Sequence, residues 1–443
     1  MAHSRLTRRM AVVAVLTLLA AVALLPMGAA QAEERQAHPG IWIERNNQFN
    51  PQHGVRGGSG TITDPYIISG WETDVIYIKD TDAYVEIFNN AVTNVMVLDW
   101  IGDRVYVHDN DVDDLRVNQN VRRKGEATSG VISNNNFEVV GQLRHWDGIF
   151  EDNVVGLAPE AVDSQQPWDS VFDQLFDFRA VNFDGFNGAI FRDNTIYGYM
   201  DARLHGHHHS SDFGGSSHYH GTDEAASHSM MDMDHSKRYH EVWILNNKIV
   251  SDSYYALAYL DTAHSANDRT AASERNEELN KPHAHFTRVH IIGNKLSGAG
   301  LGVEIFNARD ERHTGTNRGL VELKNNKIAL VENEMFPWQS LHGIYARSAR
   351  DIDLQIVGNV ITAEQSETEV PFFGDYGAGI DLTEFDKGDV LIANTSVDNL
   401  YYGINAHDFS KTVFWTISDF KTSNVQETVY WDDSVKNPPE QNP

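Results

Sequence analysis

The octapeptide VELKNNKI, residues 321–328, contains the pattern that decides the fold of this chain. Apolar and polar residues alternate through its first four positions, and two asparagines follow. An apolar residue returns two positions after the second asparagine. Alternation over about four to eight residues is typical of a half-buried β-strand. Asparagine suits a tight bend because it tolerates left-handed backbone angles. The segment therefore predicts a strand, a bend and the start of a second strand.

The same pattern recurs along most of the chain. Further copies lie at 85–92, 105–112, 131–137, 149–155, 190–196, 243–249, 290–296, 355–361 and 391–397. We assign the second position of the asparagine pair to Asn90, Asn110, Asn135, Asn153, Asn194, Asn247, Asn294, Asn326, Asn359 and Asn394. The closest copies are 18, 20 and 25 residues apart, and the last are 32, 33 and 35 apart. Repeats with such periods indicate a solenoid, and aligned asparagines in stacked coils are expected to form a ladder.

A second recurring element is a glycine followed by an apolar strand. It appears as GLGVEIF (300–306), HGIYAR (342–347), GAGIDL (377–382) and YGINAH (402–407). With the asparagine pattern, this gives two or three short strands for each coil. The chain is therefore predicted to be all-β, a single-stranded right-handed parallel β-helix (solenoid) with loop and short-helix insertions. A β-propeller or β-sandwich is the alternative, but its repeats would be more evenly spaced, with frequent Asn-Gly hairpin turns.

The first 32 residues have the features of a signal peptide. Arg5, Arg8 and Arg9 precede an apolar run at 10–25, and Ala30-Gln31-Ala32 fits a cleavage site. An uncleaved membrane anchor is the alternative. No second apolar stretch approaches the roughly 20 residues that span a bilayer, so the mature chain is expected to have no transmembrane domain. We predict a secreted, periplasmic or cell-surface protein.

The composition of the chain excludes some classes of binding partner and of metal site. The chain has 443 residues, and its 35 Lys and Arg against 63 Asp and Glu give a net charge of −28, which argues against nucleic acid. It has no cysteine, so disulfides and thiolate metal sites are excluded.

The β-helix is predicted over 33–432, with insertions at 157–184, 201–240 and 262–288 and a disordered tail at 433–443. The first and third insertions are each expected to contain a short helix.

The second insertion is rich in histidine. Nine of the chain's 21 histidines lie between His205 and His240, and methionines stand beside them. Alternate residues of an extended segment point to the same side, so each His-x-His pair presents two imidazoles to one ion. Imidazole suits copper and zinc, and thioether selects Cu(I). We predict a transition-metal site, copper first and zinc next, drawn from His205, His207, His209, His218, His220, Met231, Met233, His240, His283 and His285. A solvated loop and the rim of an active site are the two alternatives.

The opening coils resemble a known family. GSGTITDPYIISGW (58–71) and the following VIYIKDTDAYVEIFNNAV are similar to the NosD-like periplasmic β-helix proteins, within the carbohydrate-binding and sugar-hydrolase, pectin-lyase-like group. The resemblance covers roughly residues 55–115. It implies the fold, export, and a link to copper handling or to polysaccharides.

Polysaccharide chemistry is therefore the second functional hypothesis, as a lyase, an epimerase-like enzyme or a binding protein. β-Helix lyases use an Arg or Lys base and calcium held by carboxylates, since removal of a proton next to a carboxylate needs its charge neutralised. The candidates are Asp201 and Arg203 in YMDARLH, and Glu304 and Arg309 in VEIFNARDERH. Surface ion pairs are the alternative explanation of both clusters.

One further motif resembles the mannuronan C5-epimerases. YGINAHD (402–408) is similar to their Tyr-Gly-Phe-Asp-Pro-His-Asp motif, and Tyr402, Gly403, His407 and Asp408 match it. The position of the catalytic aspartate is Asn405, and the proline is replaced by Ala406. This departure removes the carboxylate on which the epimerase mechanism relies. A Tyr-Gly pair that enters a β-helix strand explains the motif equally well.

Overall fold

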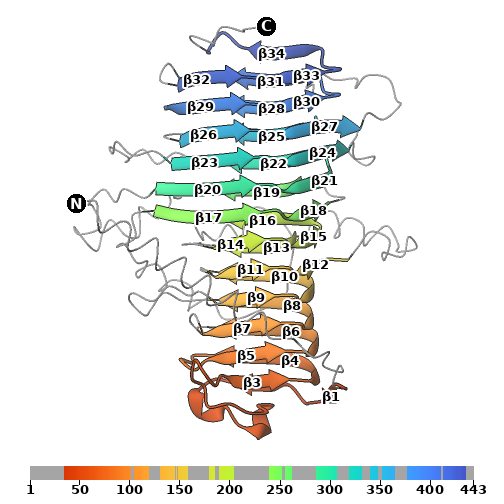
Figure 1. Cartoon of the computed structure of the whole chain (residues 1–443), viewed down its shortest axis with the longest axis vertical. Coiled ribbons are helices and arrows are strands. Elements are labelled where there is room, and N and C mark those ends of the chain that lie inside the picture. The colour runs from red at the N-terminus through yellow and green to blue at the C-terminus, as the bar shows by residue number, and fades with distance from the viewer. Residues whose placement is uncertain are drawn as a thin grey trace, which may run out of the picture.

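A computed structural model confirms the predicted right-handed parallel β-helix (Figure 1). The structure describes residues 34–99, 101, 104–118, 130–144, 146, 148–157, 179–184, 189–203, 239–251, 255–261, 286–306, 319–331, 340–347, 352–364, 377–410 and 413–435. All pairings between its named strands are parallel. Within the described residues, no helix has the length and apolar character needed to cross a membrane.

The strands form three faces of the solenoid. Face 1 is a 12-stranded sheet made of one strand from each coil. Its strands are β3 (Tyr66–Ser69), β5 (Val85–Phe88), β7 (Val105–His108), β9 (Val131–Ser133), β11 (Ile149–Glu151), β14 (Ile190–Arg192), β17 (Tyr239–Leu245), β20 (Phe286–Ile292), β23 (Gly319–Lys324), β26 (Ile352–Val357), β29 (Gly388–Ala393) and β32 (Val413–Ser418).

A 22-stranded sheet bends to form the other two faces. Face 2 consists of β1 (Gln36–Ala37), β12 (Val154–Val155), β15 (Thr195–Tyr197), β18 (Lys248–Val250), β21 (Lys295–Ala299), β24 (Lys327–Val331), β27 (Val360–Glu364), β30 (Ser396–Asp398) and β33 (Lys421–Ser423). Face 3 consists of β2 (Ile41–Ile43), β13 (Arg179–Asp184), β16 (Tyr199–Arg203), β19 (Tyr255–Asp261), β22 (Leu301–Phe306), β25 (His342–Arg347), β28 (Ala378–Thr383), β31 (Tyr402–His407) and β34 (Glu427–Trp431). Four long strands run through both faces: β4 (Trp71–Lys79), β6 (Ala91–Asp99), β8 (Asp111–Asn118) and β10 (Asn136–Arg144).

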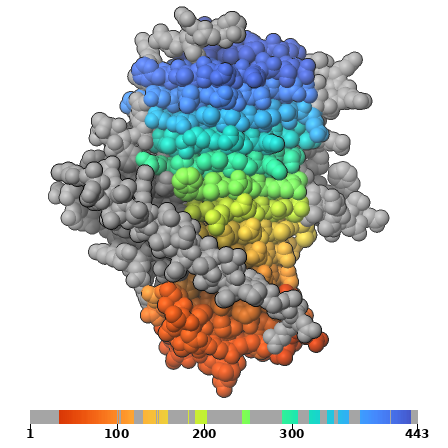
Figure 2. Space-filling model, viewed as in Figure 1, coloured from red at the N-terminus to blue at the C-terminus, as the bar shows by residue number. Residues whose placement is uncertain are grey.

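The core is built by alternation along each strand. In β2, Ile41 and Ile43 are buried and Trp42 between them is half exposed. Side chains of one parity therefore point inward and stack, coil on coil, into columns of isoleucine, valine and leucine. Two short 3-10 helices, η1 (Asn46–Gln48) and η2 (Pro51–His53), lie between β2 and β3. Figure 2 shows the coils as successive bands along the long axis, so that each packs against its neighbours.

Each asparagine pair makes the bend between face 1 and face 2. The first residue of the pair takes a left-handed conformation, with φ between 50° and 58° at Asn89, Asp109, Asn134, Asp152, Asp193, Asn246 and Asn325. Glycine replaces it at Gly293 and Gly358, where φ is 73° and 70°. Asparagine, aspartate and glycine adopt these angles at the lowest energetic cost, which explains the residue types of the repeat.

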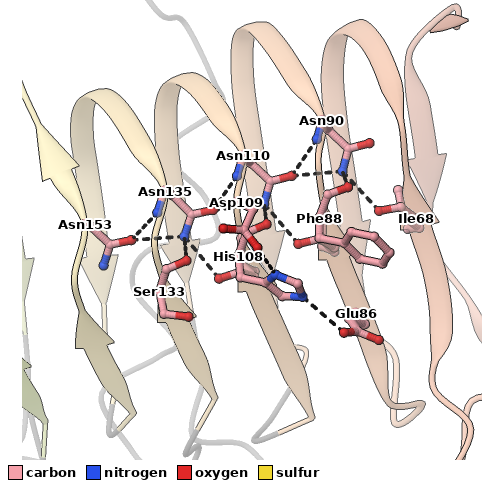
Figure 3. Close-up of polar contacts among 12 residues, drawn as sticks. Ile68, Glu86, Phe88, Asn90, His108, Asp109, Asn110, Ser133, Asn135 and Asn153 are labelled. Carbon is pink, nitrogen blue, oxygen red and sulfur yellow. Dashed lines mark hydrogen bonds and ion pairs between the residues drawn. The ribbon is translucent and has the colours of Figure 1, made fainter. Parts of the chain in front are cut away.

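The second residue of the pair forms the predicted ladder inside the solenoid (Figure 3). Asn135 Nδ2 donates to Asn153 Oδ1 at 3.0 Å, and Asn135 Oδ1 accepts from Asn110 Nδ2 at 2.9 Å. Nδ2 of Asn135 also donates to the carbonyl oxygens of Ser133 and Val107. Side-chain links of this kind continue from Asn90 to Asn359. Each ladder asparagine thereby satisfies backbone groups that the bend leaves unpaired.

The last copy corrects one sequence assignment. Asn394 was placed in the ladder, but it has a φ of 50° and occupies the left-handed position before it. Thr395 is the buried residue that follows, and its Oγ1 lies 3.4 Å from Asn359 N. The copy reads Asn-Thr instead of Asn-Asn, so its only asparagine is one position earlier than in the other copies. The ladder of asparagines therefore ends at Asn359.

Of the predicted insertions, the structure describes only the strand-forming margins. β13 lies at the end of the 157–184 range, and β16 and β17 border the 201–240 range. Both expected short helices and the 436–443 part of the tail lie outside the described residues, as does the signal peptide.

Candidate functional site: an acid and histidine cluster on face 3

The outer surface of face 3 has a cluster of ionisable side chains over four consecutive coils. In β25, Ile344 and Ala346 enter the core while Tyr345 and Arg347 alternate with them. In β28, Ile380 and Leu382 enter the core and Asp381 lies between them. Strand register aligns the outward residues into a column, Glu304–Tyr345–Asp381–Asn405. A second column beside it contains Arg347, Thr383 and His407.

Asp381 lies at the centre of the cluster and contacts two histidines from the coils on either side. Its Oδ2 is 3.1 Å from Nδ1 of His342, at the start of β25. Its Oδ1 is 3.7 Å from Nε2 of His407, near the end of β31. The other ring nitrogen of His407 lies 3.1 Å from Thr383 Oγ1 and 3.3 Å from Asp408 Oδ2. One carboxylate therefore orients two imidazole rings.

Glu304 forms the second acidic position, two coils before Asp381. Its Oε1 lies 3.1 Å from Nη2 of Arg347. At about 4.8 Å for each strand spacing, the backbones of Glu304 and Asp381 are about 10 Å apart, with Tyr345 between them. The Tyr345 ring stacks on His342 at 5.2 Å, and the Arg347 guanidinium carbon lies 5.7 Å from the Tyr345 ring centre.

The pKa values of Asp381 and Glu304 differ because the two carboxyl groups have different surroundings. Burial opposes ionisation of Asp381, but the imidazole rings of His342 and His407 beside it prevail and lower its pKa to about 2. Burial raises the pKa of Glu304, and the charge of Asp201 adds to this effect against the opposing charges of Arg347 and His342. Two carboxyl groups with such different pKa values are typical of an acid and a base that act together.

The pKa values of His407 and Tyr345 are both raised. The Asp381 carboxylate, 3.7 Å from its Nε2, raises the pKa of His407 to about 9, so the ring is cationic at neutral pH. Burial raises the pKa of Tyr345, so its hydroxyl keeps its proton. Glu304 and Asp381 are 4% and 5% exposed, whereas the side chains of Arg347 and His407 are 40% and 36% exposed. A ligand that approaches from solvent therefore meets the cationic groups first.

Of the four polysaccharide candidates, Glu304 belongs to this cluster and Asp201 lies near it. Asp201 is 2% exposed and occupies the same outward column as Glu304, two coils earlier. Arg203 lies in β16 beside Asp184 and Asp261 of the neighbouring coils, with only its backbone described. Arg309 lies outside the described residues.

Most of the cluster was missed from the sequence, namely His342, Tyr345, Arg347 and Asp381, although His407 was singled out within a motif. These residues lie in HGIYAR, GAGIDL and YGINAH, motifs that predict strands and also place polar residues at alternate positions. Their polar residues alternate with the core residues, so they share the outer side of one face. A register that aligns the glycines of these motifs also aligns Tyr345, Asp381 and Asn405.

The epimerase-like motif acquires a carboxylate from the neighbouring coil. Asn405 stands where that family has its catalytic aspartate, and it pairs in register with Asp381. Asp381 in turn contacts His407 of the same motif. A carboxylate therefore lies next to Asn405, but Asp381 of the preceding coil provides it.

The structure leaves the predicted metal site untested. His205, His207, His209, His218, His220, Met231, Met233, His283 and His285 lie outside the described residues, and His240 is described only in its backbone, in β17. Within the described part of the chain, no group of three or more His, Asp or Glu side chains is arranged to hold a metal ion.

No protein-family model matches the chain, and no curated protein or solved structure is significantly similar to it.

Proposed function

We propose that the protein is an enzyme that acts on a uronate-containing polysaccharide, with the cluster on face 3 as its active site. The observation that carries this proposal is Asp381, a buried and ionised carboxylate between two histidines, beside the buried Glu304 and its partly exposed partner Arg347. An acid, a base and two cations on one surface are the groups that proton removal next to a carboxylate requires. A polysaccharide lyase is the reaction class that we favour.

The cations bind and neutralise the substrate carboxylate. Arg347 is a permanent cation, and the raised pKa of His407 keeps its ring charged at neutral pH. Both are partly exposed, so an anionic sugar reaches them directly. Neutralisation of the carboxylate makes the neighbouring carbon-bound proton more acidic, which is the step that a lyase must accelerate. In calcium-dependent lyases the metal ion has this role, so calcium is an additive to be varied in the test.

His342 is the proposed base. Oδ2 of Asp381 lies 3.1 Å from Nδ1 of His342, and a proton held on that nitrogen leaves the lone pair on Nε2. Nε2 takes the proton from C5 of the uronate, and the released electron pair forms the C4–C5 double bond. The bond between C4 and the bridging oxygen breaks, and that oxygen takes a proton from Glu304. Burial raises the pKa of Glu304, which suits it to donate this proton.

The test is a screen of the full chain against alginate, polygalacturonate and glycosaminoglycans, with and without calcium. A lyase gives unsaturated products that absorb ultraviolet light. An epimerase instead incorporates solvent deuterium at C5 without cleavage, and a binding protein retains the polymer unchanged. Either of these last two results overturns the lyase mechanism, and the absence of both binding and turnover overturns the proposed function.

The matched variants are His342→Gln and His108→Gln. His342→Gln is expected to lower kcat by about 100-fold or more, within the range for loss of a general base. His108 is also a histidine between two carboxylates, Glu86 and Asp109, but it lies on face 1 (Figure 3). His108→Gln should leave kcat unchanged. Equal activity of His342→Gln and the wild type would exclude His342 as the base.

Transition-metal binding is the second candidate function, and the sequence of the 201–240 insertion supports it. This segment leaves the described chain at the end of β16, the strand of Asp201, on the face of the proposed active site. The NosD-like family, a periplasmic or otherwise exported location and copper as the preferred ion stay proposals that depend on the sequence resemblance and composition.

A further inference from the structure

The outward column that contains Glu304 extends to the N-terminal end of face 3. Strand register aligns Trp42 with Tyr77, Tyr77 with Val97, Val97 with Arg116 and Arg116 with Gln142. The backbone register continues through Asn182, Asp201 and Ala258 to the coil of Glu304. Eight strand spacings of about 4.8 Å separate β2 from β22, which places Trp42 about 38 Å from Glu304 along the solenoid.

Trp42 and Tyr77 form an aromatic pair at the far end of this column. Trp42 is 51% exposed, although its neighbours Ile41 and Ile43 are fully buried. Its ring centre lies 5.2 Å from that of Tyr77, with an angle of 41° between the planes. Tyr77 alternates with the core residues Ile76 and Ile78, so it faces the same side. The first coils of face 3 therefore present an aromatic surface to solvent.

Two of the four exposed aromatic side chains among the described residues lie in this column. The four are Trp42, Tyr106, Phe414 and Tyr430. Tyr106 and Phe414 lie on face 1, in β7 and β32, whereas Trp42 and Tyr430 both lie in the column of Glu304 and Asp381. Tyr430 is adjacent to Asn405 in register and packs against Tyr402, with ring centres 5.5 Å apart. The acid and histidine cluster thus lies between two aromatic positions of the same strand register.

We propose that Trp42 and Tyr77 form a remote binding platform for the same uronate polysaccharide, which lies along face 3 parallel to the solenoid axis. This inference rests on the proposed function. Sugar rings present apolar C–H faces that stack on aromatic rings, and an exposed tryptophan offers the largest such surface. Arg116 lies between the platform and the cluster, with 53% of its side chain exposed; its Nε pairs with Asp114 at 2.7 Å, and the other N–H groups of its guanidinium suit a uronate carboxylate. Long chains therefore contact both sites, and short oligosaccharides contact the cluster alone.

The test compares Trp42→Ala with the wild-type full chain on two substrates. One is polymeric alginate or polygalacturonate, whichever the wild type cleaves or binds, and the other is its oligosaccharides too short to span about 38 Å. Trp42→Ala is expected to raise KM for the polymer about tenfold, equivalent to about 1.4 kcal/mol, with kcat unchanged. KM for the short oligosaccharides should not change. Where the wild type binds without turnover, Kd replaces KM in each comparison.

Two further variants make the result specific. Phe414→Ala removes an aromatic residue of similar exposure from face 1 and should leave KM for the polymer unchanged. Trp42→Phe keeps a ring in place and should restore most of the polymer affinity. Unchanged polymer KM in Trp42→Ala, with an active wild type, overturns the platform and leaves the proposed function intact. A wild type that neither binds nor cleaves any of these polymers overturns both.

Discussion

A single ladder asparagine links three coils of the solenoid. The side chain of Asn135 donates to Val107 O of the coil before it and to Asn153 Oδ1 of the coil after it. It also accepts from the backbone N–H and the side-chain amide of Asn110. Asn135 is 1% exposed, so water cannot replace these partners. A buried donor or acceptor that loses its partner costs about 1–3 kcal/mol.

Asn135→Ala is therefore expected to destabilise the solenoid by about 2–4 kcal/mol, because it leaves several buried groups without partners. Asn136→Ala is the matched control. Asn136 is the next residue, is exposed, and donates only to Asp111 through its side chain. The control should lie within about 0.5 kcal/mol of the wild type. The urea denaturation midpoint measures both, and equal midpoints would contradict a stabilising ladder.

The pairing of Asp381 with His407 predicts a pH-dependent contribution to stability. The folded pKa of His407, about 9, lies above the ordinary value of 6.5, so its contribution is complete below pH 6.5 and is lost as pH rises through 9. The folded pKa of Asp381, about 2, lies below the ordinary 3.8, so its contribution is complete above pH 3.8 and is lost as pH falls through 2. The pair is fully effective between these limits. Since His407 is partly exposed, solvent screening limits its contribution to about 1 kcal/mol or less.

His407→Gln is the variant that tests this contribution. The difference in melting temperature between wild type and variant should be largest near pH 5–6 and should close above pH 9, where the wild-type histidine is neutral. His108→Gln, with its ion pairs on face 1, shows whether any partly buried histidine gives the same profile. A difference that persists unchanged to pH 10 would exclude the charge of His407 as its cause.

At the scale of the element, face 3 owes its close coil packing to a column of glycines. A Cβ on Gly343 would lie 2.4 Å from Ile361 Cγ2 and 2.5 Å from the carbonyl oxygen of Gly379. Gly302 and Gly403 meet equivalent backbone oxygens in the next coil. Together with Gly379, these glycines are the second residues of the strands that hold Glu304, Tyr345, Asp381 and Asn405. They therefore set the spacing of the outward column as well as that of the core.

Gly343→Ala is expected to destabilise the protein by about 1–3 kcal/mol, since either the strand or Ile361 must move to admit the methyl group. It should also lower activity, because Tyr345 and Arg347 would shift with the strand. Gly57→Ala is the control, because a Cβ there has no atom within 4 Å. Chemical denaturation of both variants gives the comparison. Equal stability of the two would show that the column tolerates a side chain.

At the scale of the whole molecule, the predicted metal-binding segment lies in the sequence between two strands of the solenoid, and its residues 206–236 belong to neither strand. Residues 206–236 connect β16 to β17, which pair with different faces, and neither strand is shortened by their removal. The scaffold should therefore survive the deletion. The His-x-His pairs and methionines lost with this segment are the predicted ligands for copper or zinc.

Deletion of residues 206–236 is expected to abolish a micromolar or tighter site for Cu(II), Cu(I) or Zn(II). Titration calorimetry on the intact and deleted chains measures it. Binding should weaken below about pH 6, since protons compete for imidazoles with an ordinary pKa of about 6.5. A site that survives deletion and is lost in His283→Ala belongs to the scaffold. The absence of any site in the intact chain at neutral pH would rule out the metal hypothesis.

The repeat positions were predictable because each depends on a few adjacent residues. Alternation set the strands, and the left-handed residue followed by Asn135 or its equivalents set the bends. Asn394 was misassigned because asparagine fits both the left-handed position and the ladder, and only the register of β30 separates them. Glu304 and Asp201 were predicted as candidates from local charge clusters. His342, Arg347 and Asp381 were missed because none of them stands next to another ionisable residue in the sequence.

The sequence alone determined the solenoid, because a coil depends on alternation and bend residues that lie next to one another in the chain. Only the tertiary structure decided the candidate site, because its members are drawn together by the register of successive coils. Asp381 lies 39 positions from His342 and 26 from His407 in the sequence, yet it contacts both. The lengths of the intervening segments vary from coil to coil, so sequence spacing does not reveal which outward residues align. Stacking of the strands fixes that alignment, and with it the burial and charge that separate the pKa values of Glu304 and Asp381.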